Sequence, residues 1–247
     1  MSHKKEEIIF GIYPVEQAIH ASVNLDKVFV QKDHNNPKLT DIINQLESKN
    51  VTISTVPKEK LNRLTRGNHQ GIVAMVSPIR FQSLEDIMEA TLAKGEPALF
   101  LILDQISDVR NFGAILRTAE CTGVDAVIVP KSGGAPVSGD TVKASAGAIF
   151  NIPVCKVDHV KDAIFYMQAS GIETVAATEK TEETLYEMDF NKPIAIIMGS
   201  EGKGISQSVL NLADHKAALP LLGEINSLNV SVACGAFLYE TVRQRGY

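Results

Sequence analysis

Three short segments of the chain combine polar side chains with glycines at spacings that could support chemistry. They are Asn111–Arg117, Met198–Gly202 and Ser227–Ser231. Each is predicted to lie at or near the end of a strand. Because an α/β sheet presents its ligand crevice outside the carboxyl ends of its strands, the three segments are expected to meet in one site.

The first segment, Asn111-Phe-Gly-Ala-Ile-Leu-Arg117, is predicted to open a helix. Asn111 is a favourable N-cap, and Gly123 is a favourable residue to end the helix. On such a helix Gly113 lies one turn before Arg117, and the bare glycine would leave room for a bulky anionic group beside the guanidinium. The alternative is a surface arginine that pairs with Glu120.

The second segment continues into a loop with three glycines within six residues, Gly199-Ser-Glu-Gly-Lys-Gly204. Glycines allow backbone N–H and C=O groups to approach a ligand without obstruction by side chains. The loop lacks the Gly-Lys-Ser/Thr ending of a phosphate-binding P-loop. Glu201 is interpreted as a polar contact in the site, with a helix-capping role as the alternative.

The third segment, Ser227-Leu-Asn-Val-Ser231, follows a predicted strand that ends at Pro220. Either Ser227 or Asn229 could cap the final helix. Capping would explain one of these residues but does not explain the whole string.

In order and spacing, the three segments resemble the signature motifs of the SpoU (TrmH-type) RNA ribose 2′-O-methyltransferases. The resemblance implies that S-adenosylmethionine is the methyl donor. It places in the catalytic centre Asn111, Arg117, Glu201, Ser227 and Asn229. It assigns to the cofactor Gly199, Gly202, Leu219, Leu221 and Leu228. Thr178, at the end of the predicted strand 173–177, is a further cofactor candidate. The family usually has a proline where this chain has Val109.

The chemistry of Arg117 limits the role it can have. The matching arginine of the family has been proposed as the base that takes the proton of the ribose 2′-hydroxyl. A guanidinium keeps its proton in proteins, because its pKa exceeds about 12. We therefore expect Arg117 to clamp the phosphate beside the target ribose and to stabilise developing alkoxide charge. A phosphate oxygen or a water molecule would then accept the proton.

Hydrophobic patterning divides the chain into a small α/β unit (1–76), a linker with one helix (77–96) and a larger α/β region (97–247). The larger region contains continuous apolar runs of strand length, which are typical of a parallel sheet covered on both faces. They are 98–103, 126–129, 173–177, 194–198 and 216–219. The resemblance implies an L30e-like RNA-binding domain at 1–76. It also implies that 97–247 adopts the SPOUT α/β-knot, a mainly parallel sheet with a deep trefoil knot.

The formal net charge of −5 argues against indiscriminate binding of nucleic acid, which needs a strong positive field. A specific RNA site needs only local clusters of cations. One such cluster is Lys58, Lys60, Arg63 and Arg66, and a second is Arg243 and Arg245. A solvated helix face is the alternative interpretation for each.

The cysteines Cys121, Cys155 and Cys234 are odd in number and widely separated, which argues against a disulfide framework or a zinc site. We expect all three to be buried. The six histidines are scattered, and no metal is predicted. The apolar runs are too short to cross a bilayer, and the N-terminus lacks the apolar core of a signal peptide. We expect a cytoplasmic protein.

The predicted function is S-adenosylmethionine-dependent methylation of a ribose 2′-hydroxyl in structured RNA. The two-domain layout is most similar to that of the RlmB-like enzymes, which methylate a guanosine of 23S rRNA. A tRNA ribose methyltransferase is the near alternative. A non-catalytic RNA-binding factor for ribosome assembly is the alternative from another class. The resemblance also implies a homodimer that packs through the knotted domain, with the arginine of one subunit reaching the cofactor site of the other.

Overall fold

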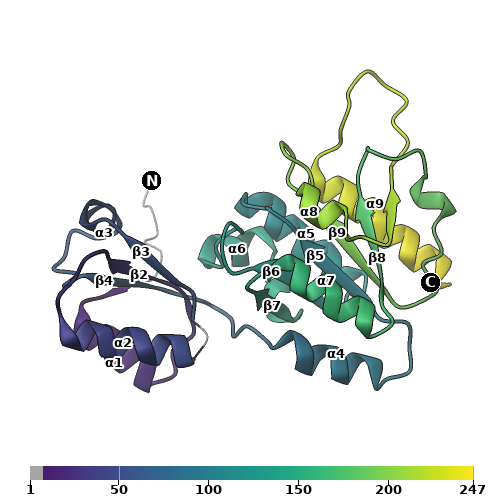
Figure 1. Ribbon diagram of the computed structural model, residues 1–247. Coiled ribbons are helices and arrows are strands. Elements are labelled where there is room, and N and C mark those ends of the chain that lie inside the picture. Colours follow the sequence, from purple (N-terminus) through teal and green to yellow (C-terminus); the bar gives the residue numbers. More distant parts are fainter. Residues whose placement is uncertain (1–7, 50, 247) are drawn as a thin grey trace. The chain divides into compact units, whose positions relative to one another are not determined.

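The computed structural model describes residues 8–49 and 51–246 (Figure 1). The chain forms two compact units. The first comprises residues up to Arg80 together with Val137–Gly139, and the second comprises Phe81–Pro136 and the chain from Asp140 onward.

The first unit is a four-stranded sheet with three helices. Its elements are β1 (Ile8–Phe10), α1 (Ile12–His20), β2 (Leu25–Gln31), α2 (Pro37–Ser48), β3 (Ile53–Val56), α3 (Lys58–Leu64) and β4 (Ile72–Val76). The strand order is β1-β4-β2-β3, with β2 and β3 parallel and the other pairs antiparallel.

The two faces of this sheet are covered by different helices. Val28 and Val30 of β2 share one apolar cluster with residues of α1 and α2. Phe29, on the opposite face of the same strand, packs with Leu61 of α3. This alternation follows from the two-residue repeat of a strand. It leaves the polar side of α3 on the surface.

The second unit contains a six-stranded sheet with helices on both faces. Its strands are β5 (Leu99–Leu103), β6 (Ala126–Pro130), β7 (Val154–Val157), β8 (Glu173–Ala177), β9 (Ile194–Met198) and β10 (His215–Ala217). Its α-helices are α4 (Leu84–Leu92), α5 (Val109–Cys121), α6 (Gly139–Ala144), α7 (Val160–Ala169), α8 (Gln207–Leu210) and α9 (Val230–Gln244). Two short 3₁₀ helices complete it, η1 (Ala148–Phe150) and η2 (Leu185–Glu187).

All neighbouring strands of this sheet are parallel, in the order β10-β8-β9-β5-β6-β7. The predicted α/β fold with a mainly parallel sheet is therefore confirmed. On one face, Phe100 and Ile102 pack in a core with residues of α4, α7 and α8. Their neighbours Leu101 and Leu103 point to the opposite face. There α9 packs against α5 and also contacts β9 (Figure 1).

The strand order reverses direction between β5 and β9. From β5 the chain moves outward through β6 and β7, and then crosses to β8 on the other side of the sheet. It returns through β9, which pairs with β5, and reaches the edge strand β10. Such a reversal opens a crevice at the carboxyl ends of the two central strands.

Several sequence predictions differ from the structure in detail. The short strands β1 and β7 were not predicted, because three or four residues give too little apolar pattern. The predicted strand 216–219 is observed as His215–Ala217. The predicted burial of all three cysteines is wrong for Cys121, which lies exposed at the last position of α5.

Candidate active site

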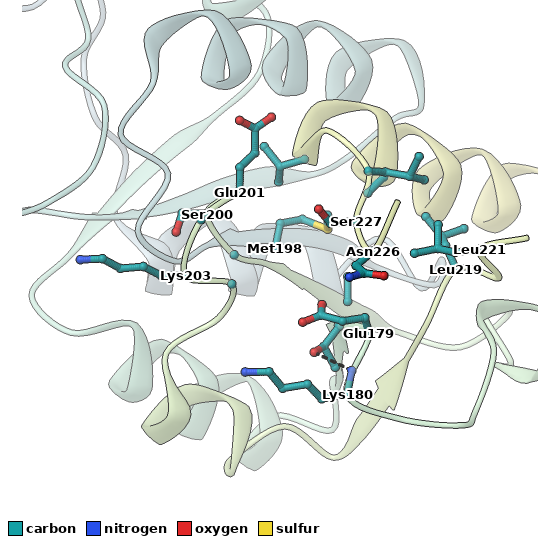
Figure 2. A pocket seen from close by; sticks show the side chains of 18 of the residues that line it. Glu179, Lys180, Met198, Ser200, Glu201, Lys203, Leu219, Leu221, Asn226 and Ser227 are labelled. Carbon is teal, nitrogen blue, oxygen red and sulfur yellow. Dashed lines mark hydrogen bonds between the residues drawn. The ribbon is translucent and has the colours of Figure 1, made fainter. Parts of the chain in front are cut away.

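A cavity of about 360 Å³ lies at the carboxyl ends of β8 and β9. Three stretches of chain form its walls: the residues after β8, the glycine loop after β9, and the loop that precedes α9. Figure 2 shows the side chains that line it. The cavity therefore adjoins the reversal point of the sheet.

The glycine loop is closed by its own backbone. Ser200 N–H donates to the carbonyl of Gly204 at 3.1 Å, and Gly204 N–H donates to the carbonyl of Ser200 at 2.8 Å. A Cβ atom added to Gly199 would lie 2.2 Å from the carbonyl carbon of Gly204 and 2.2 Å from the nitrogen of Ile205. Gly199 is therefore needed because two parts of the loop backbone meet there. Gly202 instead has open space around its missing side chain.

A buried carboxylate joins this loop to the neighbouring strand. Asp104 follows β5 directly, the residue is only 7% exposed, and its Oδ2 accepts a hydrogen bond of 2.7 Å from Ser206 N–H. Its own N–H donates to the carbonyl of Met198, which extends the β5–β9 pairing. Sequence reasoning gave Asp104 no role in the site. The signal that could have identified it is its position one residue beyond a continuous apolar run, where a polar side chain can bind the neighbouring loop.

Asn229 connects all three sequence segments. Its Oδ1 caps α9 by accepting from Ser231 N–H at 3.0 Å and Val232 N–H at 3.3 Å. Its Nδ2 donates to Asn111 Oδ1 at 3.0 Å and also to Glu201 Oε1. The predicted capping of the final helix by Asn229 is confirmed. One amide side chain thus holds the starts of two helices and the glycine loop together.

The first segment differs from its prediction in two respects. The N-cap of α5 is Asp108, whose carboxylate accepts from Asn111 N–H at 2.8 Å, and so Asn111 lies in the first turn rather than at the cap. The space predicted beside Gly113 is filled. A Cβ atom there would lie 2.3 Å from that of Ala144 and 2.9 Å from the nitrogen of Ser145. Gly113 therefore permits close packing against the end of α6.

Arg117 is exposed on α5, and its guanidinium has no hydrogen bond or ion pair with any residue that the structure describes. The alternative pairing with Glu120 is not observed. Glu120 instead accepts a long hydrogen bond of 3.4 Å from Asn151 Nδ2. Arg117 is also absent from the walls of the cavity.

The structure brings most of the predicted site residues together. The six proposed for the cofactor all line the cavity: Thr178, Gly199, Gly202, Leu219, Leu221 and Leu228. Of those proposed for catalysis, Glu201 and Ser227 line it, and Asn111 and Asn229 adjoin it through the hydrogen bonds above. Glu201 does not cap a helix, because α8 begins at Gln207. Sequence reasoning missed Glu179 and Asn226, which also line the cavity.

The two arginines of the second basic cluster form hydrogen bonds within the protein. Arg243 forms two hydrogen bonds of 2.7 and 2.8 Å with Glu240. Arg245 donates to backbone carbonyls, including those of Phe190 at 2.9 Å and Pro97 at 2.6 Å. Both arginines therefore help to stabilise the end of α9. The Arg243 side chain remains 70% exposed, and RNA binding by this cluster stays a prediction.

The cations of the first cluster, on and just after α3, are exposed. They are Lys58, Lys60, Arg63 and Arg66. Lys60 Nζ lies 5.2 Å from the centroid of the Phe29 ring. This distance allows a cation–π contact that holds the ammonium near the sheet face.

Neither buried thiol is suited to act as a nucleophile. Burial raises the pKa of Cys155 and that of Cys234 to about 12, so both remain protonated at neutral pH. Within 8–49 and 51–246, no three His, Cys, Asp or Glu side chains gather in a way that could hold a metal ion. None of the helices in these ranges is long and apolar enough to span a membrane.

Two protein-family models match the chain. The model of the SpoU rRNA Methylase family matches residues 98–239, and the model for RNA 2′-O ribose methyltransferase substrate binding matches residues 8–82. Among similar sequences is YacO of Bacillus subtilis, which is named for the TrmH family of tRNA/rRNA methyltransferases. It is 33% identical over 242 residues, which cover 98% of this chain and 97% of YacO.

Solved structures show the same architecture. The SpoU methyltransferase AviRb from Streptomyces viridochromogenes, in complex with AdoMet, matches with a TM-score of 0.61 at 24% identity. The match covers 98% of this chain and 91% of AviRb. An AdoMet-bound rRNA methyltransferase from Sinorhizobium meliloti matches with a TM-score of 0.60 at 25% identity, over 96% of this chain and 86% of that one.

Proposed function

We propose that this chain, which belongs to the SpoU rRNA methylase family and is an S-adenosylmethionine-dependent RNA ribose 2′-O-methyltransferase, modifies a guanosine of 23S ribosomal RNA. The observation that carries the proposal is the two-unit layout, in which a substrate-binding match at residues 8–82 precedes the methylase match. A separate RNA-binding unit suits a large folded substrate, which proteins recognise mainly by shape and by phosphate and 2′-hydroxyl contacts. The rRNA methyltransferase of Sinorhizobium meliloti, matched across both units, supports the same choice.

The proposed fold of each unit goes beyond the observed architecture. We assign residues 1–76 to an L30e-like RNA-binding domain, 77–96 to a linker, and 97–247 to a knotted methyltransferase domain. Support for the trefoil knot comes from the path of the chain after the edge strand β10. It returns through the loop before α9 to the centre of the sheet, where α9 packs against α5 and β9. We place the enzyme in the cytoplasm, where ribosomal RNA is modified.

The cavity has the chemical character that the methyl donor requires. The open space at Gly202 gives access to the loop backbone, and Leu219, Leu221 and Leu228 offer apolar contacts for an adenine base. When bound, the cofactor supplies an electrophilic methyl group on a sulfonium. The residues of the chain would then act by positioning, because in-line displacement depends on alignment of the nucleophile, the methyl group and the leaving sulfur.

The polar cluster of Asn111, Glu201 and Asn229 is proposed to orient the ribose that is methylated. Its side chains are already fixed by the two hydrogen bonds that Asn229 donates. Pre-organised polar groups lower the cost of aligning the reactants. The intact cluster also argues against the alternative of a non-catalytic ribosome-assembly factor.

Arg117 is proposed to act on the cavity of a second subunit. Asn111 and Arg117 are six residues apart on α5, which corresponds to about 240° around the helix axis and about 9 Å along it. The two side chains therefore leave the helix on different sides. Because Asn111 reaches Asn229 of its own chain, the exposed Arg117 is free to clamp RNA phosphate at a partner's site.

An apolar surface beside α9 supports a homodimer. Val232 and Tyr239, seven residues apart on one face of α9, are 58% and 56% exposed. The preceding loop adds Leu222 and Ile225, which are 100% and 78% exposed. Large apolar patches on a protein surface are typical of protein–protein interfaces, and these four exposed side chains are candidates for one. We therefore propose that a second copy of the chain covers it.

An inter-subunit complementation experiment tests this arrangement. Arg117→Ala and Glu201→Ala chains would carry different tags, be co-expressed, and be purified as a heterodimer. If Arg117 acts in trans, one of the two symmetric sites is complete, and the heterodimer should recover about half of the wild-type turnover. If Arg117 acts in cis, both sites are defective and turnover stays near that of the single variants. Sedimentation that shows only monomer at micromolar concentration would contradict the dimer.

Mapping of 2′-O-methyl groups tests the substrate. Ribosomal and transfer RNA from cells with and without the gene would be compared, and the deletion would be complemented with wild-type protein and with Arg117→Ala. We expect one guanosine of 23S rRNA to lose its methyl group in the deletion and to regain it only with the wild-type protein. Loss of a tRNA methyl group instead would establish the tRNA alternative. RNA binding without any methyl incorporation would favour the assembly factor.

A further inference from the structure

Four charged side chains line the cavity, and one of them, Glu179, points into it and has no part in the polar cluster proposed to orient the methylated ribose. Glu201 is engaged by Asn229, and Lys180 and Lys203 extend away from the middle of the cavity (Figure 2). The carboxylate of Glu179 instead points into the cavity, toward the region that the amide of Asn226 also faces (Figure 2).

Glu179 and Asn226 both have unused hydrogen-bonding capacity. Neither side chain forms a hydrogen bond or ion pair with any residue in the described part of the chain. A carboxylate accepts hydrogen bonds only, whereas an amide both donates and accepts. A pair of hydroxyl groups matches this combination, because each hydroxyl can donate to the carboxylate and also accept from the amide.

The position of Glu179 in the sheet supports the same ligand. Glu179 lies two residues beyond the end of β8, and β8 pairs with β9, which carries the glycine loop. In other doubly wound sheets, an acidic residue near the strand beside a glycine-rich turn binds the ribose hydroxyl of a nucleotide. The leucines that suit a base lie in the same cavity.

We propose that Glu179, facing Asn226, binds the ribose hydroxyls of the methyl-donor nucleoside. The proposal rests on the assignment of this cavity to S-adenosylmethionine and adds a specific polar contact to it. Glu179 thereby selects a ribonucleoside and fixes the sugar between the base and the sulfur.

Two ligands without a sulfonium charge separate the possible roles of Glu179. S-adenosylhomocysteine carries both the ribose and the amino-acid portion, whereas 5′-methylthioadenosine carries the ribose but no ammonium group. Their dissociation constants would be measured by titration calorimetry on the full-length wild-type protein, on Glu179→Gln and on Glu182→Gln. Glu182 is an exposed residue of the same loop that does not line the cavity, and so it controls for a general loss of charge.

We expect Glu179→Gln to weaken both ligands by the same factor, about tenfold, which corresponds to about 1.4 kcal/mol. Glu182→Gln should leave both dissociation constants unchanged. Weaker binding of S-adenosylhomocysteine alone would mean that Glu179 pairs with the ammonium group, and would overturn the proposal. An unchanged Glu179→Gln, or an equal loss in Glu182→Gln, would also overturn it. If the wild-type protein bound neither ligand, the proposed function itself would fail.

Discussion

Substitution by alanine should affect two glycines of one loop differently: at Gly199 it should lower stability, and at Gly202 it should weaken ligand binding. Gly199 and Gly202 are three residues apart, and both line the cavity. A methyl group at Gly199 would lie 2.2–2.5 Å from three backbone atoms of the facing strand of the loop, at Gly204 and Ile205. A methyl group at Gly202 would meet no atom within 4 Å. The pair therefore separates the structural need for glycine from the need for access by a ligand.

The size of the effect at Gly199 can be worked out in two ways. If the loop stays closed, overpacking of this kind costs about 1–3 kcal/mol. If the loop opens, it loses the two backbone hydrogen bonds between Ser200 and Gly204, which contribute about 0.5–1.5 kcal/mol each. Both routes give a similar loss, which lowers the thermal midpoint of a domain of this size by about 2–12 °C. Gly202→Ala should stay within about 2 °C of wild type, as expected for a surface substitution.

Thermal unfolding followed by circular dichroism, with and without S-adenosylhomocysteine, measures both effects. Gly199→Ala should unfold at a lower temperature even without ligand. Gly202→Ala should match wild type without ligand but gain less stability when ligand is added, because its methyl group occupies space that the ligand would otherwise use. Equal midpoints for wild type and Gly199→Ala would refute the reasoning, and so would a similar loss in the ligand-free Gly202→Ala protein.

Three further outcomes are expected. Native protein treated with iodoacetamide should be alkylated at Cys121 alone by mass spectrometry, because burial raises the pKa of the other two thiols to about 12; modification of either in folded protein would contradict this. Lys192, whose Nζ lies 2.6 Å from Glu173 Oε2, and to a smaller extent His215 hold the pKa of Glu173 below its ordinary value. The ionised Glu173 therefore stabilises the folded protein above that ordinary value, and this contribution is lost as the pH falls through the folded-state pKa. Urea unfolding of Glu173→Gln should therefore depend less on pH in this acidic range, and a curve parallel to wild type would exclude the effect. Asn229→Asp keeps the helix cap but loses both donated hydrogen bonds, so it should lower the thermal midpoint by about 2–12 °C and lower turnover at least about tenfold; wild-type turnover would contradict the donor role of the amide.

The sequence was most informative about the strands of the large sheet and about the loops that directly follow them. Continuous apolar runs predicted five of the six strands of the large sheet, because a strand covered on both faces has no polar alternation. The short strand β7 lacked such a run. The loops that follow these strands could be placed at one edge because all parallel strands point the same way. Strand order is set by long-range packing, and it could not be derived from local patterns.

The sequence could not show which way a glycine or a cation faces. Gly113 and Gly199 had the pattern of residues that approach a ligand, yet both are required where backbone or side chains of the protein itself come close. The sequence also did not show that Arg243 and Arg245 have carboxylate and carbonyl partners within the protein. For Gly113 and Arg245 the contact comes from residues distant in sequence, and for Gly199 it depends on closure of the loop in the tertiary fold. Glu240, the partner of Arg243, lies only three residues away on the same helix.

Asn229 illustrates how one position can satisfy a local rule and a global one at once. As an N-cap, it could be replaced by Asp or Ser with little loss, since all three accept hydrogen bonds from the first turn of a helix. Neither Asp nor Ser can replace the two hydrogens on its Nδ2, which are donated to Asn111 and to Glu201. An aspartate would have no hydrogens to donate and would place a second negative charge beside Glu201, and a serine could not reach both acceptors while capping. The capping geometry therefore allows several residues, whereas the junction of the three loops requires an amide.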